Sequence, residues 1–169
     1  DNDTLAVIKK CISTRLPPAT PDDLKNVLQH MHFTSGADRD MVVHKYAEYF
    51  NDAAKTATVL QFGNMADAPG WGDPEMQQLS RALPAFTACK VLQLDGHSIT
   101  GKVLELLAGA LPQMPCLEML CLAGGGTDRT TFDGKGLQHL HQPIEVCPRL
   151  EGLMLPKRLQ DTPDAKALK

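Results

Sequence analysis

The chain has 169 residues, of which 43% are hydrophobic and 22% are charged, and its formal net charge is −3. This composition fits one globular domain, and the near balance of charges argues against the basic stripe of a nucleic-acid-binding protein. The longest nearly apolar run, residues 103–111, is about half as long as a bilayer-spanning helix requires.

Residues 1–56 lack the leucine pattern of the rest of the chain and are predicted to form a helical N-terminal cap. Thr20 precedes Pro21 and two acidic residues, an arrangement typical of a helix start. Apolar residues at helical spacing follow it, and similar spacing predicts a short helix before it and a helix over residues 40–54. The apolar positions of these three predicted helices are Leu5, Ile8 and Ile12; Leu24, Val27, Leu28 and Met31; and Val42, Val43, Tyr46, Tyr49, Phe50 and Ala53.

From residue 57 the sequence repeats one pattern four times, apolar-x-x-Leu-x-apolar. The segments read ATVLQF, CKVLQL, LEMLCL and LEGLML, and their central leucines are 32, 28 and 33 residues apart. Between them lie helical apolar spacings with a start signal such as Thr100 and a stop signal such as Pro112. The pattern therefore predicts four strand–helix units with equivalent leucines at Leu60, Leu92, Leu120 and Leu153.

This repeat resembles the leucine-rich repeat family in its longer, ribonuclease-inhibitor-type form. The resemblance covers residues 57–156 and implies an α/β fold: a short leucine-rich-repeat-like solenoid with parallel strands along a concave face and helices outside. The residues that carry it in the second and third units are Leu92, Leu94, Ile99, Leu117, Leu120 and Leu122.

The sequence departs from the family in several places. The asparagine that the family often places after the strand falls at Met65, His97 and Gly125, and insertions occupy residues 66–72 and 127–136. A small doubly wound α/β sheet has the same alternation of strands and helices and is the alternative fold. Residues 157–169 are polar and are predicted to form a mobile C-terminal tail.

The residues beside the repeated leucines are predicted to face the concave surface, because strand side chains alternate. Two columns result that carry no charge, with Asp95 and Glu118 only at their margin. We expect this face to be covered by the chain's N-terminal helices or by another protein, since exposed apolar patches mark interaction sites. The alternative is a short array that tolerates a mildly apolar face. The predicted face residues are Val59, Gln61, Val91, Gln93, Met119, Cys121, Gly152 and Met154, and Asp95 at the margin is also predicted as a partner contact.

Trp71 lies in the glycine- and proline-rich segment APGWGDP beside the first unit. A tryptophan there either closes over the core or is exposed as an anchor for a partner, and tryptophan is enriched among interface hot spots. We predict that Trp71 is a partner contact.

Residues 96–102, GHSITGK, match the phosphate-loop pattern GxxxxGK between a strand and a helix. Val103 stands where magnesium binding needs Ser or Thr, and Ile99 is explained as a core residue. The glycines of residues 124–126 could hold an anion through backbone N–H groups, but an insertion loop is the simpler interpretation. No nucleotide or other cofactor is therefore predicted.

Two His-x-His pairs, His30 with His32 and His139 with His141, are the candidates for metal ligands. Residues two apart on a helix point to nearly opposite sides, so neither pair can hold a metal alone. Cys121 could form a nucleophilic dyad with a histidine, but a strand cysteine is more often structural. We therefore predict neither a metal site nor a catalytic residue.

The interpretation that unites these features is a non-enzymatic protein-interaction module, an accessory or scaffold subunit that docks on a larger complex. Helices followed by a few repeats resemble the layout of mitochondrial coupling factor B-like proteins, which implies an organellar membrane complex. The alternatives are a soluble regulatory adaptor or inhibitor with one transient partner, and a small α/β enzyme or nucleotide-binding protein. No nucleic acid, membrane span or small-molecule substrate is predicted.

The chain has five cysteines, an odd number without the regular spacing of a disulfide framework. They are expected to be reduced, which favours a reducing intracellular compartment and leaves mitochondrion and plastid open. Because the chain begins at Asp1, a removed leader and a fragment of a longer protein both stay open.

Overall fold

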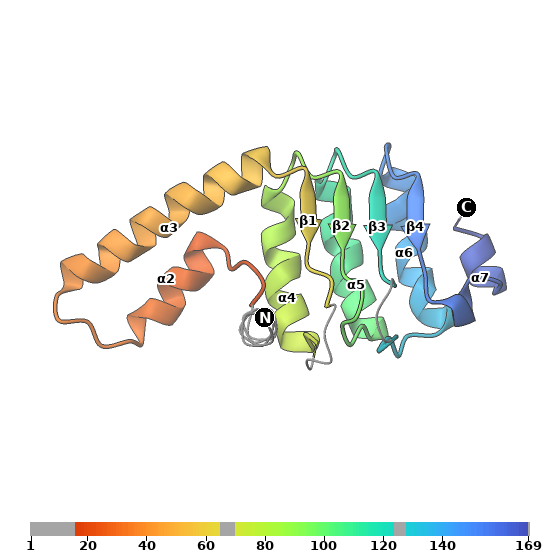
Figure 1. Cartoon of the computed structure of the whole chain (residues 1–169), viewed down its shortest axis with the longest axis horizontal. Coiled ribbons are helices and arrows are strands. Elements are labelled where there is room, and N and C mark those ends of the chain that lie inside the picture. The colour runs from red at the N-terminus through yellow and green to blue at the C-terminus, as the bar shows by residue number, and fades with distance from the viewer. Residues whose placement is uncertain (1–15, 65–69, 124–127, 169) are drawn as a thin grey trace, which may run out of the picture.

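The structure is a computed structural model that describes residues 16–64, 70–123 and 128–168. It is an α/β solenoid in which four parallel strands lie side by side in chain order (Figure 1). The strands are β1 (Val59–Gln61), β2 (Val91–Gln93), β3 (Met119–Cys121) and β4 (Gly152–Met154). The helices are α2 (Pro21–Gln29), α3 (Gly36–Thr56), α4 (Asp73–Ala82), α5 (Gly101–Ala110), α6 (Gly134–Val146) and α7 (Pro163–Lys166), with 3₁₀ turns η1 (Leu83–Ala85), η2 (Leu111–Gln113) and η3 (Lys157–Leu159).

The register of the sheet confirms the repeat read from the sequence. Leu60 pairs with Leu92, Leu92 with Leu120, and Leu120 with Leu153, each in parallel strands. We call Leu60, Leu92, Leu120 and Leu153 the register leucines. Successive strands are neighbours without a reversal of order, and α4, α5 and α6 lie behind the sheet in Figure 1. This arrangement is a leucine-rich-repeat-like solenoid, not a doubly wound sheet.

The core lies between the sheet and the helices behind it. Leu92 and Leu120 are fully buried, and Leu107 of α5 and Leu140 of α6 are buried in the same cluster. Each helix begins at a defined signal: Thr100, for example, accepts a hydrogen bond from the Val103 N–H. A Leu-Pro pair then turns the end of α4 and of α5 into a 3₁₀ turn. Local signals thus set the helix length and return the chain to the next strand.

A histidine replaces the usual asparagine in the turn after β2. His97 is 3% exposed, and its Nε2 donates to the Phe62 carbonyl at 2.7 Å. Its Nδ1 accepts from the Trp71 N–H at 2.8 Å, which fixes the neutral tautomer of the ring. Gly96 precedes it with φ 78°, a left-handed conformation in which an added Cβ would meet the Asn64 backbone. His97 therefore links two consecutive units, as an asparagine ladder would.

Helices α2 and α3 form an arm beyond the β1 end of the solenoid (Figure 1). The predicted helix over residues 40–54 is longer than expected, because Ser35 caps α3 at its start. Of the apolar positions predicted for the helix after Thr20, Leu28 is buried, but Val27 is more than half exposed, and so is Met31 just beyond the end of α2. The apolar positions predicted near residues 5–12 lie outside the described residues.

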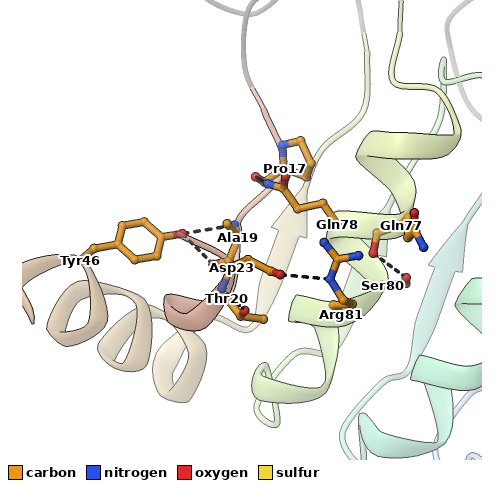
Figure 2. Close-up of polar contacts among 9 residues, drawn as sticks. All are labelled: Pro17, Ala19, Thr20, Asp23, Tyr46, Gln77, Gln78, Ser80 and Arg81. Atoms are coloured by element: carbon orange, nitrogen blue, oxygen red, sulfur yellow. Dashed lines mark hydrogen bonds and ion pairs between the residues drawn. The ribbon is translucent and has the colours of Figure 1, made fainter. Parts of the chain in front are cut away.

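The arm is held to the solenoid at its base. Phe50 of α3 packs edge-on against Phe86 at 5.6 Å between ring centroids. Figure 2 shows the polar contacts nearby: the Tyr46 hydroxyl donates to the Ala19 carbonyl at 2.7 Å, and Arg81 of α4 pairs with Asp23 of α2 at 3.1 Å. The arm thus covers the end of the core and leaves the front of the sheet open.

The C-terminal segment is folded, which corrects the prediction of a mobile tail from residue 157. Leu159 of η3 and Ala165 of α7 are buried and belong to the core cluster. Asp164 packs against Gly134 at the start of α6, and its carboxylate accepts from the Gln138 amide at 3.3 Å. Two apolar residues at the right spacing are enough to anchor a mainly polar segment.

Substitution of Leu120 by Ala should lower the free energy of unfolding by about 3 kcal/mol, because it leaves a cavity beneath the central strands. Urea unfolding monitored by circular dichroism measures this change. The matched control is Met119→Ala, whose side chain is 39% exposed and should cost less than about 1 kcal/mol. Equal losses for the two variants would contradict the assigned register.

Asp23→Asn should lower the free energy of unfolding by about 0.5 kcal/mol at pH 7. Burial raises the pKa of Asp23, but hydrogen bonds from Arg81 and Thr20 and the charge of Arg81 outweigh it, so the folded pKa lies below 3.8. A lowered folded pKa stabilises the fold above about pH 4, and this contribution is lost as the pH falls through the folded value. The difference between wild type and variant should therefore shrink in urea titrations below pH 4.

Asp22→Asn is the control, because Asp22 occupies the same first turn of α2 and lies near the same helix dipole. Only Asp23 pairs with Arg81. An Asp22 variant with the same pH-dependent loss would show that the helix dipole, and not the ion pair, accounts for the effect.

Candidate partner-binding face

The side of the sheet opposite the helices carries the residues predicted as a binding face. We call this surface the open sheet face, formed by Val59, Gln61, Val91, Gln93, Met119, Cys121, Gly152 and Met154. Val59 is 52% exposed and Met154 48%, although both are large and apolar. Val91 and Gln93 are half-buried. Helices α2 and α3 therefore do not cover this face, and the third predicted N-terminal helix, near residues 5–12, lies outside the described residues.

Cys121 lies on the predicted side of the sheet but is buried, so its prediction as a partner contact is wrong. Strand alternation puts it in register with Gln93 and Met154, yet only 2% of it is exposed. Its Sγ lies 3.5 Å from the Met154 Sδ, so a short side chain is covered by its longer neighbour. Burial raises the pKa of the Cys121 thiol, and the negative charge of Asp95 raises it further. Cys121 is therefore a packing residue, and its environment disfavours a thiolate nucleophile.

The rim of the open sheet face is polar. At the amino ends of the strands, Lys90 pairs with Glu118 at 2.9 Å across β2 and β3. At the carboxyl ends, Asp95 is half-buried, and an added Cβ on Gly63 would meet its carboxylate at 2.6 Å. An uncharged, partly apolar centre with a charged rim is the arrangement typical of protein interfaces.

Trp71 is not the exposed anchor that we predicted. It is 7% exposed and stacks on His97 with ring centroids 4.5 Å apart and an angle of 11° between the planes. Phe62 lies on it as well, at 5.3 Å between centroids. Trp71 therefore closes over the core beside the first two strands, which was the other possibility that the sequence left open.

The GxxxxGK turn is filled by its own side chains. His97 and Ile99 are buried in it, and the Ser98 N–H donates to the Trp71 carbonyl at 3.0 Å. The Val103 N–H is bonded to the Thr100 hydroxyl. These N–H groups serve the fold, whereas a phosphate loop directs such groups at a ligand. Lys102 points to solvent, and residues 124–126 lie outside the described residues.

The histidine pairs are separated in the fold. His30, His32 and His139 are exposed, while His141 is half-buried with no hydrogen-bond partner for its Nε2. Within residues 16–64, 70–123 and 128–168, no three His, Cys, Asp or Glu side chains come together as a metal site. In the same ranges, no helix has both the length and the apolar character to cross a membrane.

Two features of the surface escaped the sequence. The arm exposes large apolar side chains, among them Met41 and Tyr49. Helical spacing alone does not show whether these positions face the core or the solvent. A groove of about 470 Å³ also lies along β4, between that strand and the C-terminal segment. The only available signal for the groove was the apolar spacing of Leu159, Ala165 and Leu168 within a polar stretch.

Comparison with known proteins gives a likeness of fold. No protein-family model matches the chain, and no curated protein sequence matches it. The structure is similar to a solved chain described as leiomodin-1 actin-binding site 2, with a TM-score of 0.54 and 15% sequence identity. The match covers 72% of this chain and 66% of that chain, slightly less than two thirds of its length. This likeness supports the leucine-rich-repeat-like solenoid at the level of the fold.

The described thiols should differ in their reaction with iodoacetamide at pH 7.5. Burial raises the pKa of Cys89 to about 11, and burial also raises the pKa of Cys121 and of Cys147. Cys116 is only half-buried and should be alkylated at least about tenfold faster than these three, as measured by mass spectrometry of peptides. The difference should disappear in about 8 M urea, because the denaturant unfolds the chain and exposes all of these thiols. Labelling of Cys89 as fast as Cys116 in the folded chain would contradict the assigned burial.

Proposed function

We propose that this protein is a non-enzymatic interaction module that binds another protein through the open sheet face. The observation that carries the proposal is the exposure of Val59, Met119 and Met154 on one side of the sheet, a set that we call the apolar row. Val59 and Met119 lie in register with the half-buried Val91 between them, and Met154 lies in the adjacent register line opposite Cys121. Neither register line holds a charged residue. Burial of such side chains contributes about 25 cal/mol for each Å² removed from water. A partner that covers the row gains this free energy without the cost of desolvating a buried charge.

The composition of the face suits protein recognition. Methionine side chains are flexible and polarisable, so Met119 and Met154 can adapt to a partner's surface. Gln61 and Gln93 carry amides that can donate and accept hydrogen bonds at the same site. The leiomodin domain named above is described as an actin-binding site, so a domain of this fold can present a protein-binding surface. This supports a protein partner for the present chain without naming it.

We further propose that the module is an accessory or scaffold subunit of a larger complex, which includes an organellar membrane complex. A short array of strands with an exposed apolar face suits a permanent contact, because obligate interfaces are the more hydrophobic ones. In this proposal residues 1–56 are the helical cap, residues 57–156 the solenoid, and residues 157–169 a C-terminal segment. A soluble adaptor with a transient partner is the second candidate, favoured by the small size of the apolar row.

Val59→Lys should remove binding of the partner, because it places a charge at the edge of the apolar row. In affinity purification from the native source, quantified by mass spectrometry, the amount of partner recovered should fall at least about tenfold, the loss typical of one hot-spot residue. The matched control is Val146→Lys on α6, since Val146 is 54% exposed and Val59 is 52% exposed.

Both variants should unfold within about 0.5 kcal/mol of the wild type, as surface substitutions do. If the wild type, Val59→Lys and Met119→Lys all recover the same proteins in the same amounts, the open sheet face is not the binding surface. A subunit should remain bound through size exclusion at high salt, whereas an adaptor should dissociate, so the same preparation separates the two candidates.

A further inference from the structure

β4 is the last strand of the described sheet, and its outer edge faces a groove. The edge groove is bounded by β4 and its flanking residues on one side and by residues of the C-terminal segment, including Ala165 of α7, on the other, and its volume is about 470 Å³. Its lining is mainly apolar, with one carboxylate and one amide. The residues that line it are Glu151, Leu153, Met154, Leu155, Gln160, Ala165 and Leu168.

Two series of backbone hydrogen bonds run across the sheet and stop at this edge. In the first, the carbonyl two residues before a register leucine accepts from the next strand: Thr58 from Val91, Lys90 from Met119 and Glu118 from Gly152. In the second, the N–H two residues after a register leucine donates to the next strand: Phe62 to Gln93, Leu94 to Cys121 and Leu122 to Met154. On β4 the corresponding groups are the Glu151 carbonyl and the Leu155 N–H. They are placed to continue both series into a fifth strand.

The burial of the register leucines is also incomplete at β4, beside the groove. Leu60 is 7% exposed, and Leu92 and Leu120 are fully buried. Leu153, the fourth register leucine, is only partly buried and lies against the groove. A further strand with leucine at the register position would cover Leu153, as Leu120 is covered by its two neighbours.

Charged side chains at equivalent positions of successive strands indicate which residue a fifth strand would carry at that position. Lys90 and Glu118 occupy equivalent positions on β2 and β3 and pair at 2.9 Å. Glu151 holds the next position in the row, is exposed, and lies beside Glu118 with the same charge. A lysine or arginine at the following position would pair with Glu151, as Lys90 pairs with Glu118.

We propose that the edge groove binds an extended segment of another protein, which adds a fifth parallel strand to the sheet. Main-chain hydrogen bonds to the edge give affinity, and side chains at alternate positions give specificity. The segment needs a basic residue two positions before a leucine, with an apolar residue two positions after that leucine. This surface shares only Met154 with the open sheet face, and its test uses Glu151, which lies outside that face, so each proposal can fail without the other.

The same features argue against a second copy of this chain as the occupant. Two segments of the chain fit the requirement with leucine at both apolar positions, residues 90–94 (KVLQL) and residues 102–106 (KVLEL). The first contains β2, which is already paired on both sides, and the second lies in α5. The other edge strand of the described sheet is β1. Thr58, which directly precedes it, occupies the position where the proposal requires lysine or arginine. The described part of a second copy therefore offers no matching edge.

The test uses a fluorescein-labelled peptide with the sequence KVLQL, flanked by soluble residues, and fluorescence anisotropy with the full chain. Binding should be saturable, and Glu151→Lys should weaken it at least about tenfold, as the loss of a close charge pair does. A peptide with glutamate in place of its lysine should restore binding to the Glu151→Lys variant. Glu145→Lys, which changes an exposed charge on α6 in the same way, should leave binding unchanged.

Backbone methylation of the peptide tests strand addition directly. The valine N–H of KVLQL should donate to the Glu151 carbonyl, as the Val91 N–H donates to the Thr58 carbonyl. Methylation of that nitrogen should remove binding. Methylation of the next nitrogen, on the leucine, should be tolerated, because neighbouring N–H groups in a strand point to opposite sides. In ¹⁵N spectra, the Leu155 amide should shift when the peptide binds.

Results of three kinds would overturn the proposal. The first is the absence of binding at about 1 mM peptide, because the dissociation constant would then be higher than expected for any specific recognition of such a motif. The second is equal binding of the two methylated peptides, or an equal effect of Glu151→Lys and Glu145→Lys. The third is self-association of the chain that Glu151→Lys abolishes, because it would assign the edge to a second copy.

Discussion

The stacking of four leucines in register is the contact on which the structure depends. Each register leucine lies beside the equivalent leucine of the next strand and against the helices behind the sheet, so one side chain joins two units and two layers. In a solenoid each unit contacts only its neighbours, and stability is close to a sum of such junctions. The arm at one end and the C-terminal segment at the other limit how much of this core meets water.

The sequence predicted the features that depend on local patterns. The four strands, their parallel register and the helix starts at Thr20 and Thr100 follow from spacing and capping, and the structure confirms them. The binding face was predicted from alternation alone. Alternation assigned Cys121 to the correct side of the sheet but could not show that Met154 covers it.

The features that the sequence missed depend on which segments meet in space. Trp71 and His97 are 26 residues apart, and only the fold shows that their rings stack. The polar composition of the C-terminal segment predicts mobility, yet two apolar residues anchor this segment to the core beside α6. Composition averages over a segment, whereas packing depends on single side chains. The edge groove arises from such an arrangement and has no signature in the repeat itself.

The stacked rings give the molecule a built-in optical reporter. Trp71 is the chain's only tryptophan, and it lies between the first two units, against His97 and Phe62. Its emission therefore depends on whether β1 and β2 are joined, and it is insensitive to events at β4. A fluorescence melt follows one junction of the solenoid, while far-ultraviolet dichroism follows all of them. Comparison of the two curves distinguishes a chain that melts as one body from a chain that opens from its far end.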